Sequence, residues 1–177
     1  MNTPPEDNNP RKMGITMFIM AWAVLFIMGI VFFDDLLTEQ RNPNQNPASR
    51  TTAEGAKEVT LQSNRQHHYI ANGLINGHKT VFLLDTGATD VVIPQSLARE
   101  IGLKANGQQQ AYTANGRVTV YNTQLSSLQL GDIELRDINA SINPAMDKEV
   151  VLLGMSALKQ IEFTQRGNTL ILRQYDD

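Results

Sequence analysis

The sequence of 177 residues contains no cysteine and only three histidines. Without cysteine the chain forms no disulfide bond, no thiolate metal site and no cysteine nucleophile, and three histidines leave little for a histidine-rich metal site. Charge of neither sign is in large excess, because 15 basic and 18 acidic residues give a formal net charge of −3. The composition therefore argues against a nucleic-acid partner bound through a basic surface, and we expect neither a metal nor another cofactor.

Charge is also absent from one long stretch of the chain. Residues 13–33 carry no charged side chain, and only Thr16 among them is appreciably polar. A helix of this length spans about 30 Å, the thickness of the hydrocarbon core of a bilayer. A cleaved signal peptide has a shorter apolar stretch that ends in small residues, whereas this one ends in Phe32-Phe33. A small domain cannot cover a helix that is apolar on all sides, so the pattern predicts a transmembrane signal anchor over 13–33 that contacts the lipid bilayer.

The charges on either side of this segment predict its orientation. Arg11 and Lys12 precede it, whereas Asp34 and Asp35 follow it. Because positive charge is retained in the cytoplasm, residues 1–12 are expected to form a cytoplasmic tail and the rest of the chain to be exported. The expected location is the inner (cytoplasmic) membrane, crossed once, with the C-terminal part on the periplasmic or extracytoplasmic side.

Large apolar residues are absent from residues 41–58, which are rich in asparagine, proline and threonine. Such a segment cannot bury an apolar face, so we predict a flexible linker over 34–65. The remaining residues, 66–177, are enough for one compact domain.

Turn signals divide residues 66–177 into short segments. Glycine adjoins asparagine or aspartate at four places: 76–77, 115–116, 131–132 and 167–168. The Asn-Gly pairs tolerate the positive φ angles of two-residue hairpins, and the flanking segments are rich in strand-forming residues. Short helices are predicted only at 94–101, which ends before Gly102, and at 155–160. The domain is therefore predicted to be mainly β, as a barrel or a sandwich.

The most informative motif follows an apolar strand. Residues 81–84 are all apolar and run directly into Asp-Thr-Gly-Ala at 85–88. An Asp-Thr-Gly sequence often ends a strand as a plain turn. Here the carboxylate emerges from a core strand, and the small residues after it leave room for close approach. A second apolar run, 150–153, also leads into a glycine, at Gly154.

These residues resemble the retroviral-type (retropepsin-like) aspartic proteases, and most closely their bacterial, membrane-anchored relatives. The similarity covers residues 66–174 and implies a closed β-barrel with one or two short helices. The active-site motif of the family matches Asp85, Thr86, Gly87 and Ala88. Its second, structural signature matches Leu152, Leu153 and Gly154. Its substrate-covering flap corresponds to Tyr112, Thr113, Ala114, Asn115 and Gly116.

Two features depart from the viral pattern. The predicted flap contains one glycine, whereas viral flaps are glycine-rich. Met155-Ser156 follow the second signature, where viral sequences have the Arg-Asn or Arg-Asp pair that helps to lock the dimer. Tyr112 has two interpretations, because its ring either stacks over a bound peptide or packs at the base of the flap.

The resemblance implies hydrolysis of peptide bonds by carboxylates. Two carboxylates share one proton: one accepts a proton from the attacking water while the other hydrogen-bonds the substrate carbonyl. The sequence contains one Asp-Thr-Gly, and Asp90 and Asp132 are expected to be surface residues. The second carboxylate is therefore expected from Asp85 of a second copy, in a two-fold symmetric homodimer. The backbone N–H of Gly87 is expected close to a carboxylate, and the substrate is an extended peptide or protein segment.

Two other classes of function stay open. A peptide-binding or dimerisation module that kept the fold and lost hydrolysis is favoured by the plain region after Gly154 and opposed by the intact Asp-Thr-Gly-Ala motif. A carboxylate glycosidase needs two paired acids on one chain, and only Asp85 is well placed. The preferred prediction is a membrane-anchored aspartic endopeptidase.

Overall fold

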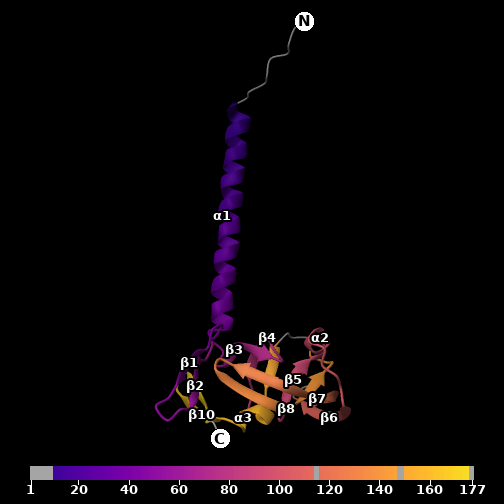
Figure 1. The fold of residues 1–177 in the computed structure, drawn as a ribbon. Helices are drawn as coiled ribbons and strands as arrows, with labels where there is room; N and C mark the ends of the chain where they lie inside the picture. The colour runs from indigo at the N-terminus through magenta and orange to yellow at the C-terminus, as the bar shows by residue number, and fades with distance from the viewer. Residues whose placement is uncertain (1–9, 114–115, 147–149, 176–177) are drawn as a thin grey trace. The chain divides into compact units, whose positions relative to one another are not determined.

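The computed structural model describes residues 10–113, 116–146 and 150–175 (Figure 1). The chain divides into two compact units, Met1–Thr38 and Glu39–Asp177. Within the described ranges the helices are α1 (Pro10–Arg41), α2 (Gln95–Glu100) and α3 (Met155–Leu158). The strands there are β1 (Ala48–Thr51), β2 (Lys57–Gln62), β3 (Ile70–Ile75), β4 (His78–Leu84), β5 (Val91–Pro94), β6 (Gly107–Thr113), β7 (Gly116–Leu130), β8 (Ile133–Asn143), β9 (Val150–Leu153), β10 (Glu162–Arg166) and β11 (Thr169–Gln174).

The first unit is formed by most of α1. Its large apolar side chains from Ile15 to Phe33 are all more than half exposed, as expected of a helix with no protein surface packed around it. The segment Gly14–Arg41 is long and apolar enough to cross a membrane, and a signal sequence near an N-terminus has the same properties. The helix continues to Arg41, past the predicted end of the apolar segment at residue 33.

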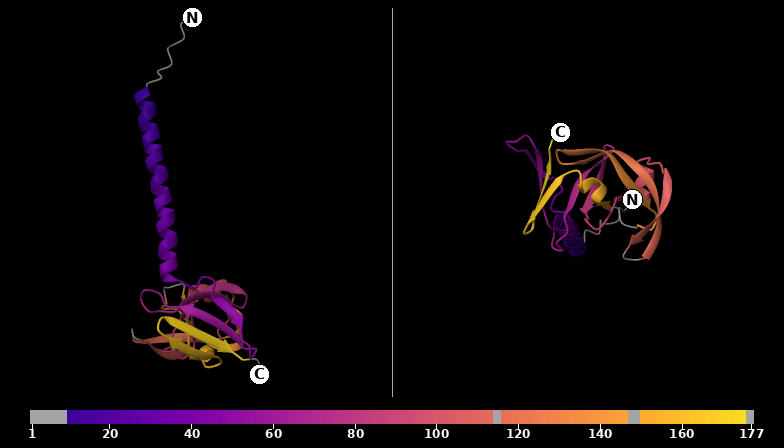
Figure 2. Two further views of the ribbon diagram at one scale, coloured as in Figure 1. Left: turned by 90° about the vertical axis from the view of Figure 1, so that its left-hand side faces the viewer. Right: turned by 90° about the horizontal axis from the view of Figure 1, so that it is seen from below.

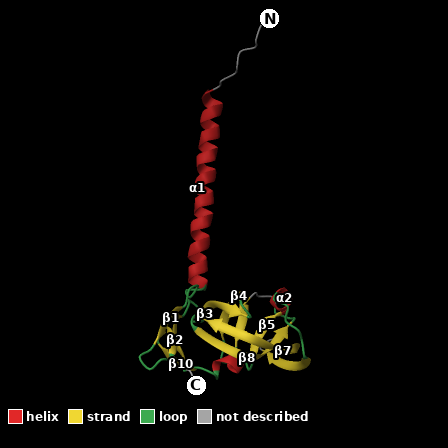
Figure 3. Cartoon of the chain, in the orientation of Figure 1, coloured by secondary structure: helices red, strands yellow, loops and turns green. Residues whose placement is uncertain are grey.

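The second unit consists of two β-sheets. The smaller has the strand order β1-β2-β11-β10, and the larger has the order β3-β4-β9-β5-β8-β7-β6. Figure 1 labels most of these strands, and Figure 2 gives two further views of them. In the larger sheet β3 also pairs with β7, through Leu74↔Gln129 and Ile75↔Leu128. Figure 3 shows how little helix accompanies these strands. The prediction of a mainly β domain with two short helices is confirmed, whereas the closed barrel implied by the resemblance stays a prediction.

The predicted turns join the strands. Asn76 and Gly77, both at positive φ (49° and 81°), connect β3 to β4 in the two-residue hairpin that Asn-Gly favours. Gly131 and Gly167 lie at the β7–β8 and β10–β11 turns, also at positive φ. The turn between β6 and β7 includes Asn115, which lies outside the described residues.

The core is formed mainly by alternate apolar side chains of the strands, together with Leu158 of α3. The largest fully buried side chains are Phe82, Leu61, Ile75, Ile93, Leu125, Leu128, Leu130, Ile133, Ile138, Leu153, Leu158 and Leu172. Both sheets contribute, and a side-chain amide joins them. Gln174 on β11 donates to the backbone oxygen of Glu134 on β8 (2.6 Å) and accepts from the N–H of the same residue (3.1 Å). The small sheet is therefore an integral part of the second unit.

The prediction of a flexible linker over 34–65 is wrong. Asn42 and Asn44 are only 8% and 5% exposed, and β1 and β2 form half of the small sheet. The side chain of Asn44 donates to the backbone oxygens of Gln62 and Ile70 (2.8 and 2.7 Å) and accepts from the N–H of Gln62 (2.7 Å). The linker prediction considered only large apolar residues, whereas asparagine is buried here because its amide replaces missing backbone partners.

The same segment is bound to β3 as well. The side-chain amide of Asn42 donates to Asn72 (2.8 Å), and the amide of Asn72 donates to the backbone oxygen of Gln45 (2.9 Å). The backbone N–H of Asn72 also donates to the backbone oxygen of Asn44 (3.1 Å). The folded unit therefore begins near Glu39 and not at residue 66.

Candidate active site

Asp85 lies at the carboxyl end of β4, where the chain leaves the sheet. β4 runs parallel to β9, with Leu84 paired to Leu153. Because both strands end at the same edge of the sheet, the chain after β4 lies beside Gly154, which follows β9. The backbone N–H of Asp85 donates to the oxygen of Leu153 (3.1 Å), which continues the ladder by one bond. The fold thus brings together the two motifs that the sequence separates by about 65 residues.

The Asp-Thr-Gly-Ala loop presents one carboxylate in a fixed orientation. Asp85 is half-buried, and its Oδ1 accepts a hydrogen bond from the backbone N–H of Gly87 (2.9 Å). The backbone N–H of Ala88 donates to the oxygen of Asp85 (3.2 Å) and closes the turn. Asp85 is partly exposed, and the next two residues of the loop, Thr86 and Gly87, are exposed.

Gly154 supports this loop from below. A Cβ at Gly154 would overlap the backbone oxygens of Asp90 and Ala88, so no other residue fits without moving the loop. The next two backbone N–H groups, of Met155 and Ser156, donate to the oxygens of Ala88 and Thr89 (2.8 Å each). The second signature therefore acts as the floor on which the Asp85 loop rests.

Ser156 has a role that the sequence analysis missed. Its hydroxyl, in a side chain that is 8% exposed, accepts from the N–H of Val91 (2.9 Å) and donates to the oxygen of Asn139 (2.7 Å). It joins the end of the active-site loop to β8. The interpretation that the region after Gly154 has no particular structural role is therefore wrong. The buried hydroxyl of Ser156 satisfies a backbone donor and a backbone acceptor there.

The predicted flap coincides with the hairpin of β6 and β7, in which Tyr112 is paired with Arg117 and Thr113 with Gly116. Ala114 and Asn115 lie outside the described residues. Tyr112 is 77% exposed, and the guanidinium of Arg117 lies 5.1 Å from the centre of its ring. Tyr112 therefore does not pack at the base of the flap. At that base, the side-chain amide of Gln109 donates to Oδ2 of Asp90 (3.4 Å), a contact that no sequence pattern indicated.

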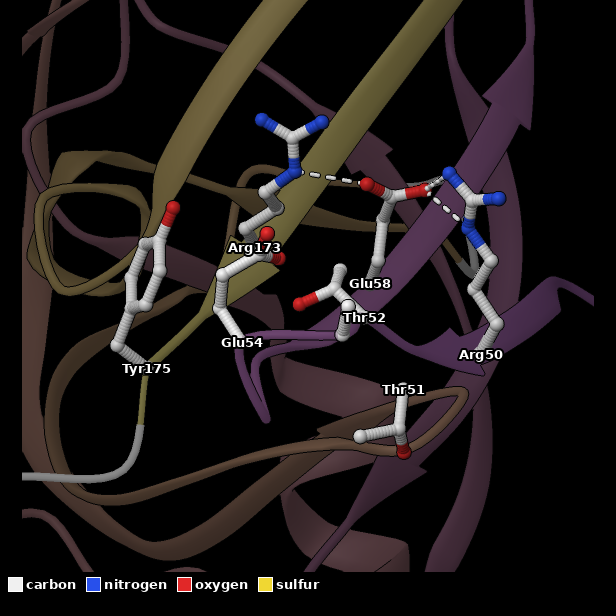
Figure 4. A pocket seen from close by; sticks show the side chains of 8 residues that line it. Arg50, Thr51, Thr52, Glu54, Glu58, Arg173 and Tyr175 are labelled. Atoms are coloured by element: carbon white, nitrogen blue, oxygen red, sulfur yellow. Dashed lines mark hydrogen bonds and ion pairs between the residues drawn. The ribbon is translucent and has the colours of Figure 1, made fainter.

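A concave region lies at the small sheet, and none of the residues that line it belongs to the Asp85 loop. It is a pocket of about 540 Å³ lined by Arg50, Thr51, Thr52, Ala53, Glu54, Glu58, Arg173 and Tyr175 (Figure 4). Glu58 is 1% exposed and lies between two arginines: its oxygens are 2.6 Å from Arg50 and 2.7 Å from Arg173. The buried carboxylate of the pocket is thus neutralised by two of the side chains that line it.

The ionisation of these groups follows from the pairing. The hydrogen bond from Arg173 lowers the pKa of Glu58, and the bond from Arg50 acts in the same direction, against the effect of burial. The same bond raises the pKa of Arg173. A carboxylate with these partners stays ionised and neutralised, which suits a structural ion pair better than proton transfer. Within the described part of the chain, no group of three or more histidine, aspartate or glutamate residues is arranged to hold a metal ion.

The Asp-Thr-Gly-Ala loop after β4 rests on Gly154, which follows the parallel strand β9. The sequence and the fold around it are similar to those of the class of retropepsin-like aspartic proteases. A sequence model of the family described as gag-polyprotein putative aspartyl protease matches residues 71–160, just over half of the chain. The chain belongs to this family.

The chain is also similar to individual proteins. The crystal structure of a retropepsin-like aspartic protease from Rickettsia conorii superposes with a TM-score of 0.58 and 27% identity, covering 73% of this chain and 96% of that one. An uncharacterized protein in the cobV 5′ region of Sinorhizobium sp is 33% identical over 127 residues, and one from Rickettsia prowazekii (strain Madrid E) is 26% identical over 132 residues. These matches cover 70% and 73% of this chain but only 54% and 56% of the two relatives, so the chain spans about half of their length.

Proposed function

We propose that the chain is an aspartic endopeptidase, anchored in a membrane by α1, in which Asp85 is the catalytic carboxylate. The observation that carries the proposal is the geometry of the loop after β4. Asp85 is accessible, its Oδ1 is held by the N–H of Gly87 (2.9 Å), and the loop rests on Gly154. These residues resemble the family's active-site motif, and they lie within the matched region 71–160.

The reaction requires a second carboxylate. Asp85 is the one aspartate of the chain in an Asp-Thr-Gly, and the two-fold axis of a homodimer would place a second Asp85 opposite the first. At close range the two carboxylates share one proton. The ionised one takes a proton from water as the water attacks the peptide carbonyl, and the protonated one donates to the carbonyl oxygen. Thr86 would hydrogen-bond across to the partner loop and hold the two carboxylates in register.

The substrate is proposed to be an extended segment of peptide or protein. It would lie between the loop of Asp85 and the β6–β7 hairpin, and its backbone would hydrogen-bond to strand edges. The flap residues of this proposal are Tyr112, Thr113, Ala114, Asn115 and Gly116.

The location proposed for the enzyme is the inner membrane. Arg11 and Lys12 on one side of the apolar segment and Asp34 and Asp35 on the other favour an N-terminus in the cytoplasm and a protease domain in the periplasm. Protease added to intact spheroplasts would then degrade the domain, whereas an internal domain would survive.

Mixing experiments with the full chain in detergent test the shared site. Wild-type subunits are co-refolded with a nine-fold excess of Asp85→Asn subunits, and hydrolysis of a fluorogenic peptide is measured. If each site needs two Asp85 carboxylates, activity per wild-type chain falls about tenfold, because nearly every wild-type subunit then has an inactive partner. An unchanged activity per wild-type chain, with total activity lowered only by the dilution of wild-type subunits, would contradict the dimeric site.

The matched control is an equal excess of Asp132→Asn subunits. Asp132 lies exposed in the β7–β8 turn, and these subunits keep Asp85. The activity divided by the total number of chains, wild type and variant together, is therefore expected to stay unchanged. A well-folded dimer that binds a pepstatin-type inhibitor but cleaves no member of an unbiased peptide library would favour the alternative, a binding module without hydrolytic activity.

A further inference from the structure

The two faces of the β6–β7 hairpin differ in what they contact. Successive side chains of a strand point to opposite faces, so Gln109 and Gln110 lie on different sides of the hairpin. Gln109 is paired with Val120, which is 2% exposed, and this face is turned toward the domain. Gln110 is paired with Thr119, and its amide donates to the Thr119 hydroxyl (2.9 Å).

The outer face ends in the exposed pair of Tyr112 and Arg117. Tyr112 is two residues from Gln110 and therefore on the same face, and its ring contacts the guanidinium of Arg117 (5.1 Å). The aromatic ring of the flap thus points away from the side on which Gln109 approaches the active-site loop. The inner face carries Gln109, Ala111 and Val118.

Gln109 contacts the active-site loop at a point that is itself fixed. Its Nε2 donates to Oδ2 of Asp90 (3.4 Å), five residues after Asp85. The backbone oxygen of Asp90 packs against Gly154, and the following N–H, of Val91, is bonded to Ser156 (2.9 Å). The carboxylate of Asp90 is therefore presented from a rigid backbone, whereas Gln109 and its neighbours Gln108 and Gln110 are exposed.

We infer that Gln109 is a positioning residue that holds the flap over the active-site loop through its hydrogen bond to Asp90. The inference rests on the proposed function for its catalytic meaning, but the contact joins two defined segments and can be measured without catalysis. A single long hydrogen bond between exposed groups opens and closes readily, as a flap that admits a substrate requires.

The first test measures hydrogen exchange of the full chain in detergent. Gln109→Glu places a carboxylate against Asp90 and removes the donor, so amide exchange in 107–113 and 116–122 is expected to rise about tenfold. The matched control is Gln110→Glu, which adds the same charge one residue away on the outer face. Its carboxylate can accept from the Thr119 hydroxyl in place of the amide's donation, so the exchange of these segments is expected to stay unchanged. Equal effects of the two substitutions, or no effect of Gln109→Glu, would overturn the inference.

The second test restores the bond. In the double variant Gln109→Glu with Asp90→Asn, the new amide at position 90 donates to the new carboxylate at position 109, and slow exchange is expected to return. In peptide hydrolysis, Gln109→Glu is expected to raise KM about fivefold with a smaller change in kcat, because the flap is less often closed on the substrate. The double variant is expected to recover part of this loss.

The two proposals fail in different ways. If wild type hydrolyses no peptide while Gln109→Glu still releases the hairpin and the double variant restores it, hydrolysis is refuted and the flap contact stands. If wild type is active and the double variant exchanges as fast as Gln109→Glu alone, the role of Gln109 is refuted and the hydrolytic function stands.

Discussion

At the scale of single residues, the site depends on two residues that have opposite requirements. Asp85 must present a carboxylate to solvent, and the N–H of Gly87 orients it. Gly154 must present nothing, because the backbone of residues 88–90 occupies the place of its side chain. A substitution of Asp85, the proposed catalytic group, is therefore expected to disturb folding less than a substitution of Gly154, and to disturb the proposed activity more.

Gly154→Ala is expected to destabilise the second unit by about 3 kcal/mol, because the added methyl group overlaps the rigid backbone of the Asp85 loop. The free energy of unfolding of the full chain in detergent, measured by urea-dependent pulse proteolysis, provides the test. Gly107→Ala is the control, since a Cβ there meets its nearest neighbour, Nδ2 of Asn122, at an ordinary 3.5 Å. Equal stability of the two variants would show that the loop yields to the methyl group.

The sequence predicted these residues unequally. Asp85 and the glycines around it belong to a motif whose meaning is local, because an apolar strand followed by Asp-Thr-Gly-Ala already places a carboxylate at a strand end. Ser156 and Gln109 carry no such signal. Their roles depend on partners, Val91 and Asp90, that lie 65 and 19 residues away and are brought close only by the fold.

At the scale of elements, the small sheet is organised around a buried charge. Glu58 on β2 is 1% exposed, and it is neutralised by Arg50 from β1 and Arg173 from β11. Both neighbouring strands therefore contribute one arginine to the carboxylate of the strand between them. The two ion pairs of Glu58 hold the three strands in register, because a shift by one residue would reverse the side of the sheet on which each arginine lies.

Arg173→Met is expected to lower the free energy of unfolding by about 3 kcal/mol, because a buried carboxylate then keeps only one partner. Arg136→Met is the control: its partner Glu134 is 41% exposed and Arg136 is 75% exposed, so the loss is expected to be below about 1 kcal/mol. In the control variant no buried carboxylate loses a partner, because neither member of this ion pair is buried. A loss as small for Arg173 as for Arg136 would show that Arg50 alone satisfies Glu58.

The same two ion pairs make the free energy of unfolding depend on pH, with a sign that follows from the lowered pKa of Glu58. Since the pKa of Glu58 is lowered in the folded state, its ionisation stabilises the fold above the ordinary carboxyl range. This stability is lost as the pH falls through the lowered pKa. The difference in the free energy of unfolding between wild type and Arg173→Met is therefore expected to become smaller as the pH falls. Unfolding measurements from neutral to acidic pH test this.

At the scale of the whole molecule, the position of the domain boundary decides which fragment folds. Val59 and Leu61 on β2 are fully buried, and they are paired with Leu172 and Leu170 on β11. Removal of β1 and β2 would expose this part of the core and deprive Arg173 on β11 of Glu58, its partner at 2.7 Å.

A fragment of residues 39–177 is expected to unfold in one cooperative transition, whereas residues 66–177 are expected to lack a stable fold. Thermal denaturation followed by circular dichroism of the strands compares them. A cooperative transition of similar midpoint in the shorter fragment would refute the assignment of β1 and β2 to the folded unit.

The sequence by itself determined the apolar helix, the mainly β domain, its hairpin turns and the loop of Asp85, because each depends on residues that are adjacent or follow a short period. The tertiary structure decided what depends on distant partners. It placed Gly154 beneath the Asp85 loop, Ser156 between β5 and β8, and Gln109 against Asp90. It also incorporated residues 42–62 into the fold. Their burial rests on hydrogen bonds and ion pairs whose second members are far along the chain, and hydrophobic pattern alone does not reveal such partners.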